Sequence, residues 1–404
     1  MRCCTVLPGG EIVTGALDNL VRVWQESPDL EAAPLTLVGH ETPRGGPGVL
    51  ALTVSETGQI VSSGRDGKII TWEYLTGTAV QTLTGHGEGT SITNGQVVSS
   101  LGLTSAGEII SGSWDMSGRV WTKNGEVKAH LKEGHSAAVL GVCGLGTGEI
   151  LTACGDGKIR IWGDDGTCRK TCAGASLPLR GVAGLEGVGF VSVSNDSVLR
   201  LFSRAGDLIS QINTGGETLY AVACNPHTKR DFPEVIVGGE GGICKVYAVN
   251  PTASGLSLEL VESIPHPAAV YGVAVTPNGD IVTAGEDRTA RVWTREESRY
   301  SPASVRELFD AKVEALRAMQ LDDTPVVSMA SSSNNNPATS AQPPAGQYQH
   351  VYPVEIDTGE RLEIAWNSGE DANVVAQRFL SANRQIPKVS QSLRSLSDKN
   401  MFTS

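Results

Sequence analysis

Residues 156–162 read DGKIRIW, an aspartate followed six positions later by a tryptophan, with a β-rich stretch between them. The same spacing recurs along the first 300 residues, and successive terminal aromatic residues lie 40 to 49 positions apart. The clear copies are Asp18–Trp24, Asp66–Trp72, Asp115–Trp121, Asp156–Trp162, Asp196–Phe202 and Asp287–Trp293. A degenerate copy, GGICKVY, has Gly241 in place of the aspartate and ends at Tyr247. A fixed period of this length predicts stacked units of one supersecondary type.

A histidine motif precedes several copies. Gly-His pairs place His40, His86 and His135 ahead of their aspartates, and Pro265-His266 is a weaker version. This period and signature are typical of WD repeats, in which each unit is a four-stranded blade. In the second unit the strands are expected at 48–54, 59–65, 68–73 and 79–83. Seven copies therefore predict an all-β, seven-bladed WD-repeat β-propeller over residues 1–300.

Each motif residue has an expected structural role. The aspartate at each tight turn can accept backbone N–H bonds, and the preceding histidine can bridge to it. The aromatic residue six positions later is expected to pack between neighbouring blades. Five of the seven tryptophans occupy this position, so we assign them to the core.

The last blade is expected to be incomplete. Residues 2–7 (RCCTVL) are interpreted as the innermost strand of the first blade, but the residues after Trp293 (TREESRYSPAS) are not strand-like. In closed propellers the missing outer strand usually comes from the N-terminus. We therefore expect a last blade that is three-stranded or patched by residues 297–300, and a missing N-terminal segment as the cause.

The remaining residues change character. The pattern predicts an amphipathic helix over 301–320, with Ser301 as its cap and Pro302 in its first turn. A low-complexity linker follows at 321–347, rich in Ser, Asn, Pro and Ala. A small ββα module is expected over 348–387, and a disordered tail over 388–404.

Composition excludes several function classes. The net charge is −12 and no basic stripe is present, so neither nucleic acid nor an anionic membrane surface is an expected partner. No apolar run reaches the 18 residues of a membrane span. The eight cysteines show no paired metal spacing, and no metal or cofactor is expected. Buried thiols in a reducing compartment favour the cytoplasm and nucleus.

Several stretches together resemble one family. They are SGSWD at 111–115, SNDSVLRLF at 194–202, GEDRTARVW at 285–293, TREESRY at 294–300, and VYPVEIDTGERLEIAWNSGEDANVVAQRFLSAN at 351–383. The first four are similar to the propeller of the phospholipase A-2-activating protein family, and the last resembles the second half of its ubiquitin-binding PFU domain. The first half of that domain and the helical PUL domain, which docks the valosin-containing AAA ATPase, are not recognisable here. The resemblance implies a non-catalytic ubiquitin-binding adaptor of the ubiquitin-proteasome and AAA-ATPase pathway.

Candidate ubiquitin contacts follow from propeller geometry. Residues just before each turn aspartate should project from one face of the ring, and they are Leu17, Arg65, Trp114, Gly155, Asn195 and Glu286. The first residues of the inner strands should add Val49, Leu140, Tyr220 and Tyr271 to the same rim. Trp114 either meets a partner, as aromatic hot spots do, or packs on its own blade. In the PFU-like segment the candidates are Trp366 and Phe379, and core packing is the alternative for Phe379.

Two other functions compete with the adaptor. A general WD-repeat scaffold could bind another protein or peptide client, and one for phosphopeptides should show an Arg/Lys cluster on its face. Only Arg65 is basic among the residues before the turns, which favours ubiquitin. An enzyme is disfavoured because the sequence has no GxSxG, P-loop or HExxH motif.

Overall fold

The computed structural model describes two compact units, Met1–Thr324 and Pro325–Ser404, each considered separately below. The residues that it describes are 1–25, 33–43, 46–87, 95–215, 217–226, 232–252, 255–301, 303, 305–307, 309–311, 313–314, and the backbone of 350–355 and 361–366. The predicted linker at 321–347, the tail at 388–404 and Phe379 lie outside these residues. Among the described residues no helix is long and apolar enough to cross a membrane.

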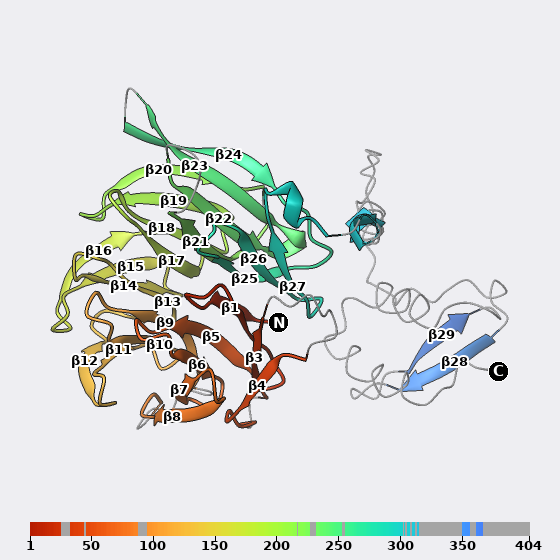
Figure 1. Ribbon diagram of the computed structural model, residues 1–404, viewed down its shortest axis with the longest axis horizontal. Helices are drawn as coiled ribbons and strands as arrows, with labels where there is room; N and C mark the ends of the chain where they lie inside the picture. The colour runs from red at the N-terminus through yellow and green to blue at the C-terminus, as the bar shows by residue number, and fades with distance from the viewer. Residues whose placement is uncertain are drawn as a thin grey trace, which may run out of the picture. The chain divides into compact units, whose positions relative to one another are not determined.

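The first unit is a seven-bladed β-propeller, as predicted (Figure 1). Blades 1 to 3 contain β1 (Cys3–Val6), β2 (Ile12–Gly15), β3 (Leu20–Trp24), β4 (Leu35–Val38), β5 (Val49–Val54), β6 (Ile60–Gly64), β7 (Ile69–Glu73), β8 (Thr78–Leu83), β9 (Val98–Leu103), β10 (Ile109–Ser113), β11 (Gly118–Trp121) and β12 (Val127–Leu131). Blades 4 and 5 contain β13 (Val139–Gly144), β14 (Ile150–Cys154), β15 (Lys158–Trp162), β16 (Cys168–Ala173), β17 (Leu179–Leu185), β18 (Gly189–Ser194), β19 (Val198–Ser203) and β20 (Leu208–Asn213).

The last two blades depart from the regular pattern. Blade 6 contains β21 (Leu219–Asn225), β22 (Glu234–Gly239), the 3-10 turn η1 (Glu240–Gly242), β23 (Cys244–Thr252) and β24 (Gly255–Ser263). Blade 7 contains β25 (Val270–Val275), β26 (Ile281–Gly285) and β27 (Ala290–Trp293), and no fourth strand pairs with β27 in the described part of the chain. The predicted incomplete last blade is therefore confirmed. Residues 297–299 do not patch it, because they form the 3-10 turn η2 (Glu297–Arg299).

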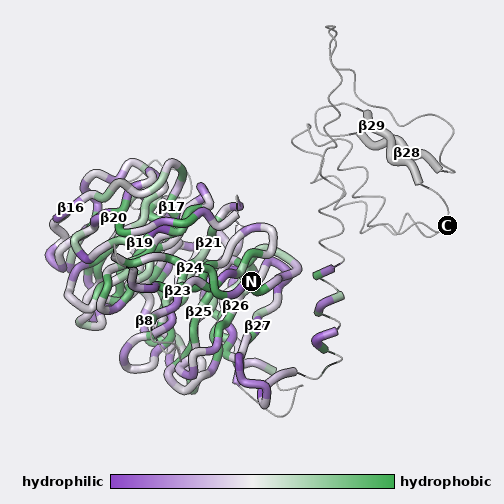
Figure 2. The backbone as a smooth tube through the Cα atoms, turned by 90° about the horizontal axis from the view of Figure 1, so that it is seen from above, coloured by the Kyte–Doolittle hydropathy of each residue, from purple (hydrophilic) through white to green (hydrophobic). Residues whose placement is uncertain are grey.

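The blades converge on a central axis. The inner strands β1, β5, β9, β13, β17, β21 and β25 each contact the next, and β25 returns to β1 (Figure 1). Small residues permit this approach: a Cβ added at Gly272 would lie only 3.1 Å from the Cα of Cys3. In Figure 2 the backbone is green along many strands and purple in many turns, as expected for strands buried on both faces.

The motif aromatics fill the gaps between blades. Trp72 packs with residues of blade 1, Trp162 with blade 3, and Tyr247 with blade 5. Trp72, Trp121, Trp162, Phe202 and Tyr247 are all at most 2% exposed. Trp24 and Trp293 are only half-buried, and both flank the incomplete blade. A fourth strand on blade 7 would cover the side from which Trp24 is exposed.

The residues after the propeller are helical where they are described. Residues 303, 305–307, 309–311 and 313–314 have helical backbone. The ring of Phe309 meets that of Trp293 edge-on at 5.4 Å, and the Arg291 guanidinium lies 5.2 Å from the Phe309 ring. This helix therefore covers part of the incomplete blade. The second unit contains the antiparallel pair β28 (His350–Glu355) and β29 (Arg361–Trp366).

Candidate functional site

The turns between the second and third strands of the blades, called the Asp turns here, share one geometry. In all six clear copies the aspartate accepts the backbone N–H two residues later, at 2.9–3.3 Å. The intervening residue has a positive φ, as at Gly67 (78°) and Met116 (65°). This is an Asx turn, which aspartate favours because its short side chain can accept a hydrogen bond from the backbone two residues later. In blade 6, Gly241 and Gly242 adopt positive φ instead.

Buried hydrogen-bond chains connect these turns to the tryptophans. In blade 2, Trp72 Nε1 donates to Ser62 Oγ at 2.8 Å, and His40 Nε2 lies 2.8 Å from the same oxygen. His40 Nδ1 lies 3.0 Å from the Asp66 carboxylate. With neutral His40 protonated on Nδ1, every donor in this chain has an acceptor. Blade 3 contains the same series of hydrogen bonds, through Trp121, Ser111, His86 and Asp115.

Blade 4 uses the opposite histidine tautomer. His135 Nδ1 lies 3.0 Å from Arg160 NH1, which can only donate, so this nitrogen must accept. Its Nε2 faces Thr152 Oγ1 at 3.2 Å, and Trp162 Nε1 donates to that oxygen. Burial and the neighbouring Arg160 lower the pKa of His135 to about 4. The aspartate therefore pairs with the arginine rather than with the histidine.

Arginine four residues after the aspartate recurs as its partner. Asp18–Arg22, Asp156–Arg160, Asp196–Arg200 and Asp287–Arg291 have N···O distances of 2.6–2.9 Å. Burial raises the pKa of Asp156 and Asp196, but the hydrogen bonds from their arginines prevail and leave both at about 2. These carboxylates are ionised and already satisfied, so they stabilise the turns rather than offering free chemistry.

One cluster among the described residues has metal-ligand composition. His135, Cys154 and Asp156 have ligand atoms within 4.8 Å of one another. The Arg160 guanidinium contacts both the imidazole and the carboxylate, at 3.0 and 2.9 Å. A cation would have to displace this arginine, so the residues present do not fit a metal ion.

A ring of β-bulges lies where the inner strands begin, on the side of the Asp turns. In blades 2 to 7 the second residue of the inner strand is skipped in the pairing with its neighbour. Arg2 takes the corresponding place in blade 1, where its N–H donates to Gly15 O at 2.9 Å. The seven residues, called the bulge ring, are Arg2, Leu50, Ser99, Leu140, Arg180, Tyr220 and Tyr271. A bulge re-aims its side chain, and all seven side chains are half-buried.

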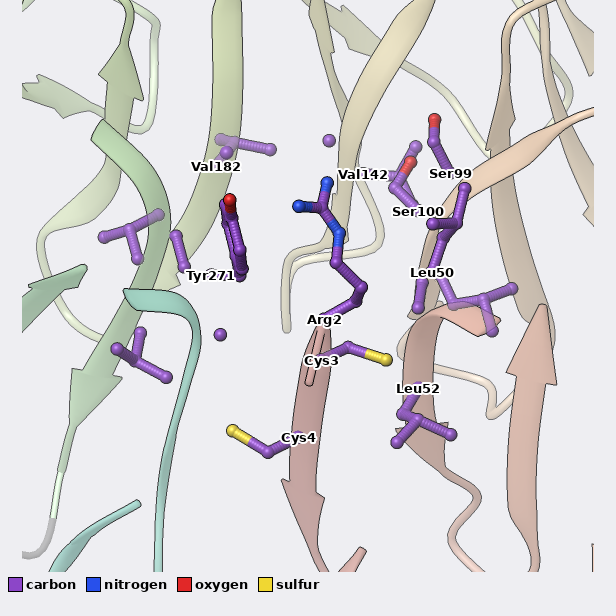
Figure 3. Close-up of a pocket in the computed structure, with 18 residues that line it drawn as sticks. Arg2, Cys3, Cys4, Leu50, Leu52, Ser99, Ser100, Val142, Val182 and Tyr271 are labelled. Atoms are coloured by element: carbon purple, nitrogen blue, oxygen red, sulfur yellow. The ribbon is translucent and has the colours of Figure 1, made fainter. Parts of the chain in front are cut away.

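The bulge ring surrounds the mouth of the central channel. A cavity of about 170 Å³ is lined by all seven inner strands, with Arg2, Leu50, Ser99 and Tyr271 among its lining residues. In Figure 3 the Arg2 guanidinium stands inside this channel, between the Tyr271 ring and the side chains of Ser99 and Ser100. The channel therefore ends in a mixed aromatic, apolar and cationic rim.

Tyrosines and arginines form a connected arc along this rim. The rings of Tyr220 and Tyr271 are 5.1 Å apart, Arg2 lies 4.0 Å from the Tyr271 centroid, and Arg180 lies 5.9 Å from that of Tyr220. Arg180 Nε also donates to Asn195 Oδ1 at 2.8 Å. Burial, followed by the nearby Glu286 carboxylate, raises the pKa of Tyr271. Burial raises that of Tyr220 as well, so both phenols remain protonated donors at neutral pH.

The structure brings together some of the residues predicted from sequence and separates others. Asn195, Tyr220, Tyr271 and Glu286 belong to the arc just described. Arg65 approaches Gly46 and Gly48 on the blade 1–2 side of the same face. Trp114 is half-buried on its Asp turn, and its Nε1 is buried without a hydrogen-bond partner among the described residues. Trp366 ends β29 in the second unit.

Sequence reasoning misplaced one rim position and missed three, Arg2, Ser99 and Arg180. Val49 is wrong as a rim residue, because it is fully buried, and the neighbouring Leu50 takes the rim position. The bulge causes this offset of one residue. Aligning the second residue of each inner strand finds Arg180, whereas Arg2 directly precedes β1. The face is consequently more basic than the residues before the turns suggested.

Seven blades with Asp turns and inter-blade tryptophans define a WD-repeat propeller, a class that typically serves as a non-enzymatic scaffold for protein partners. The family model described as "WD domain, G-beta repeat" matches residues 77–122, 125–163 and 258–294.

Among curated proteins, the chain is 30% identical over 194 residues to the ribosome biogenesis protein WDR12 homolog of Chlamydomonas reinhardtii, covering 40% of this chain and 42% of the relative. It is 28% identical over 294 residues to the ubiquitin homeostasis protein lub1 of Schizosaccharomyces pombe, covering 63% and 39%. The chain spans less than half the length of the curated relatives it matches. Among solved structures, the WD40 β-propeller domain of Doa1 is similar, with a TM-score of 0.60 and 24% identity over 74% of this chain and 94% of that one.

Proposed function

We propose that this protein is a non-catalytic ubiquitin-binding adaptor that holds ubiquitin on the Asp-turn face of its propeller. The observation that carries the proposal is the rim of the channel, where the half-buried side chains of Leu50, Leu140, Tyr220 and Tyr271 each lie at a β-bulge. Tyrosine and exposed apolar groups at the centre of a face are what protein hot spots require. Similarity to a protein named for ubiquitin homeostasis supports ubiquitin as that partner.

Trp114 extends the proposed contact surface toward blade 3. Its indole is half-buried, and the Nε1 donor has no acceptor among the described residues. Nε1 is buried, so a partner would meet the exposed part of the indole rather than Nε1, and covering an aromatic side chain at the centre of a face favours binding. In the second unit, the PFU-like segment with Trp366 and Phe379 is proposed as an additional ubiquitin contact. We place this function in the cytoplasm and nucleus.

The proposal is tested by titrating isotope-labelled ubiquitin with the full chain and following its amide resonances. Trp114→Ala and Tyr220→Ala should each weaken binding by about tenfold, as hot-spot truncations do. Tyr300→Ala is the matched control, because Tyr300 is 45% exposed after the last blade and away from the bulge ring. Unchanged affinity in both face variants, with intact thermal unfolding, would refute the face assignment.

A general scaffold for another polypeptide client is the second candidate. Arg2 and Arg180 favour it, because they add two cations to a face on which the sequence indicated only Arg65. Two results together would support the scaffold: the full chain does not bind ubiquitin, and it binds a client protein through a contact that Tyr220→Ala abolishes. The function would then be that of a scaffold without ubiquitin specificity.

A further inference from the structure

The Arg2 guanidinium at the channel mouth forms no ion pair with any carboxylate of the described residues. The guanidinium lies over the Tyr271 ring, with its central carbon 4.0 Å from the ring centroid, which is within the range of a cation–π contact. Its N–H groups donate to no acceptor among the described residues, whereas most arginines of the Asp turns are paired with carboxylates. A stacked guanidinium keeps its donor edge available for a planar, bidentate acceptor.

Space for a ligand group adjoins this cation. The cavity of about 170 Å³ is far larger than the roughly 10–15 Å³ that a single water molecule needs. In Figure 3, the Arg2 guanidinium, the Tyr271 hydroxyl and the Ser99 side chain all point toward the same end of the channel. Much of its remaining lining is apolar or small, with Leu52, Val142 and Val182 among the lining residues. A short side chain or chain end can therefore enter and meet the guanidinium.

We propose that Arg2 and the channel cavity form a carboxylate-binding subsite, which takes an acidic side chain or the free C-terminus of a bound polypeptide. This inference goes beyond the proposed function, because it holds whichever polypeptide occupies the face. A carboxylate matches the fork of a guanidinium, and partial exclusion of water strengthens the pair relative to a surface one.

The shape of the cation favours a carboxylate over a phosphate. The described charges around the mouth are Arg2, Arg65, Arg180 and the Met1 ammonium, and against them stand Glu217, Glu240 and Glu286. Burial raises the pKa of Tyr220 most, and Glu240 and Glu286 raise it further, so the glutamates act on this region and repel any anion. A carboxylate presents two oxygens to the fork of one guanidinium, whereas a phosphate brings a third oxygen and a second charge that need further donors.

The test uses short peptides and ligand-observed NMR with the full chain, tagged only at its C-terminus. The tag position matters because the Met1 ammonium donates to Gly285 O at 2.9 Å beside the mouth. The probes are acetyl-Gly-Gly-Glu-Gly-Gly-amide, its Gln counterpart, and acetyl-pentaglycine with a free or an amidated C-terminus, each up to about 10 mM to detect millimolar complexes. Binding of the Glu peptide but not the Gln peptide assigns the site to side chains. Binding of the free but not the amidated pentaglycine assigns it to chain ends.

Variants assign the binding to Arg2. Arg2→Met should weaken the favoured peptide by about tenfold, the effect expected for a charge-assisted bond, and Arg2→Lys should restore part of it. Arg169→Met is the matched control, because its side chain is 55% exposed on β16. If Arg2→Met fails to fold, Glu286→Gln replaces it, and this variant should tighten binding severalfold by removing a competing negative charge.

Three results would overturn the proposal. The first is equal binding of the charged and neutral peptides, and the second is no binding of either acid at the highest concentration. The third is tighter binding of a phosphoserine peptide than of the Glu peptide, which would make the site a phosphate receptor. None of these outcomes depends on ubiquitin, so failure of this subsite and failure of the ubiquitin proposal are separable.

Discussion

At the scale of single residues, buried hydroxyls hold the motif together. Thr152 Oγ1 lies 2.9 Å from Trp162 Nε1 and 3.2 Å from His135 Nε2, so one atom satisfies two buried ring nitrogens. In blade 1, Thr14 Oγ1 accepts from Trp24 Nε1 at 2.8 Å, but there the tryptophan is half-exposed.

Replacing these hydroxyls should have unequal effects. Thr152→Val should reduce the free energy of unfolding by about 1–3 kcal/mol, because it leaves both ring nitrogens buried and unsatisfied. Thr14→Val should cost less than about 1 kcal/mol, since water can reach Trp24. Urea denaturation of both variants measures the difference. Equal losses would mean that the hydrogen-bond chain contributes nothing beyond the shape of the side chain.

Sequence reasoning succeeded at residues where chemistry and spacing coincide. The repeat occurs seven times in the sequence, once in degenerate form. It therefore predicted the positions of the aspartates, the aromatic residues and the blades. The tautomer of His135 was not predictable, because it depends on Arg160 contacting both His135, in the loop before β13, and Asp156, in the turn after β14. Leu50 was missed for a similar reason, since a bulge shifts the register of the strand pairing and the local sequence pattern does not show it.

At the scale of elements, β27 is the weak strand of the ring. Val292, which precedes the motif tryptophan on β27, is 43% exposed. The corresponding residue of blade 6, Val246, is fully buried. Val246 packs in a core cluster with Val270 and Ile281 of blade 7. β27 itself has no fourth-strand partner in the described part of the chain, so one of its edges is unpaired. A free strand edge of this kind also offers unpaired backbone groups.

A matched pair of substitutions measures this difference. Val246→Lys should cost at least about 4 kcal/mol or prevent folding, because it buries an unpaired charge. Val292→Lys should stay within about 1 kcal/mol of the parent, since its ammonium can reach water. Urea midpoints compare the two. If Val292→Lys is as damaging as Val246→Lys, then another segment covers β27 in solution.

At the scale of the whole molecule, buried histidines tie stability to pH. Burial lowers the pKa of His135 and His266 to about 4, although the hydrogen bond to Ile264 opposes the shift in His266. Unfolded histidines titrate near 6.5, so between these values the unfolded chain binds more protons than the folded one. Their contribution is complete above pH 6.5 and is lost as the pH falls toward 4. Asp156 and Asp196, at about 2, extend the loss from pH 4 downward.

Between pH 6.5 and 4, the free energy of unfolding should fall by on the order of 3 kcal/mol for a fully buried imidazole. The fall should be smaller for the half-exposed His135. His266→Gln should flatten the fall between pH 6.5 and 4, at the expense of some stability at pH 7. The exposed His130→Gln is the control and should leave the slope unchanged. Denaturation curves at several pH values test this. An unaltered slope in His266→Gln would show that this imidazole is not neutral in the folded state.

Closure of the ring by its two most distant strands has a consequence for biosynthesis. The Met1 ammonium donates to Gly285 O, and β1 packs against β25, so the first strand of the propeller can complete its packing only after most of the other strands have been made. Contacts of such high sequence separation slow folding. During translation the flank of the first blade has no neighbour until β25 and β26 emerge. A chaperone that shields that flank would therefore be needed most in the interval before the seventh blade is made.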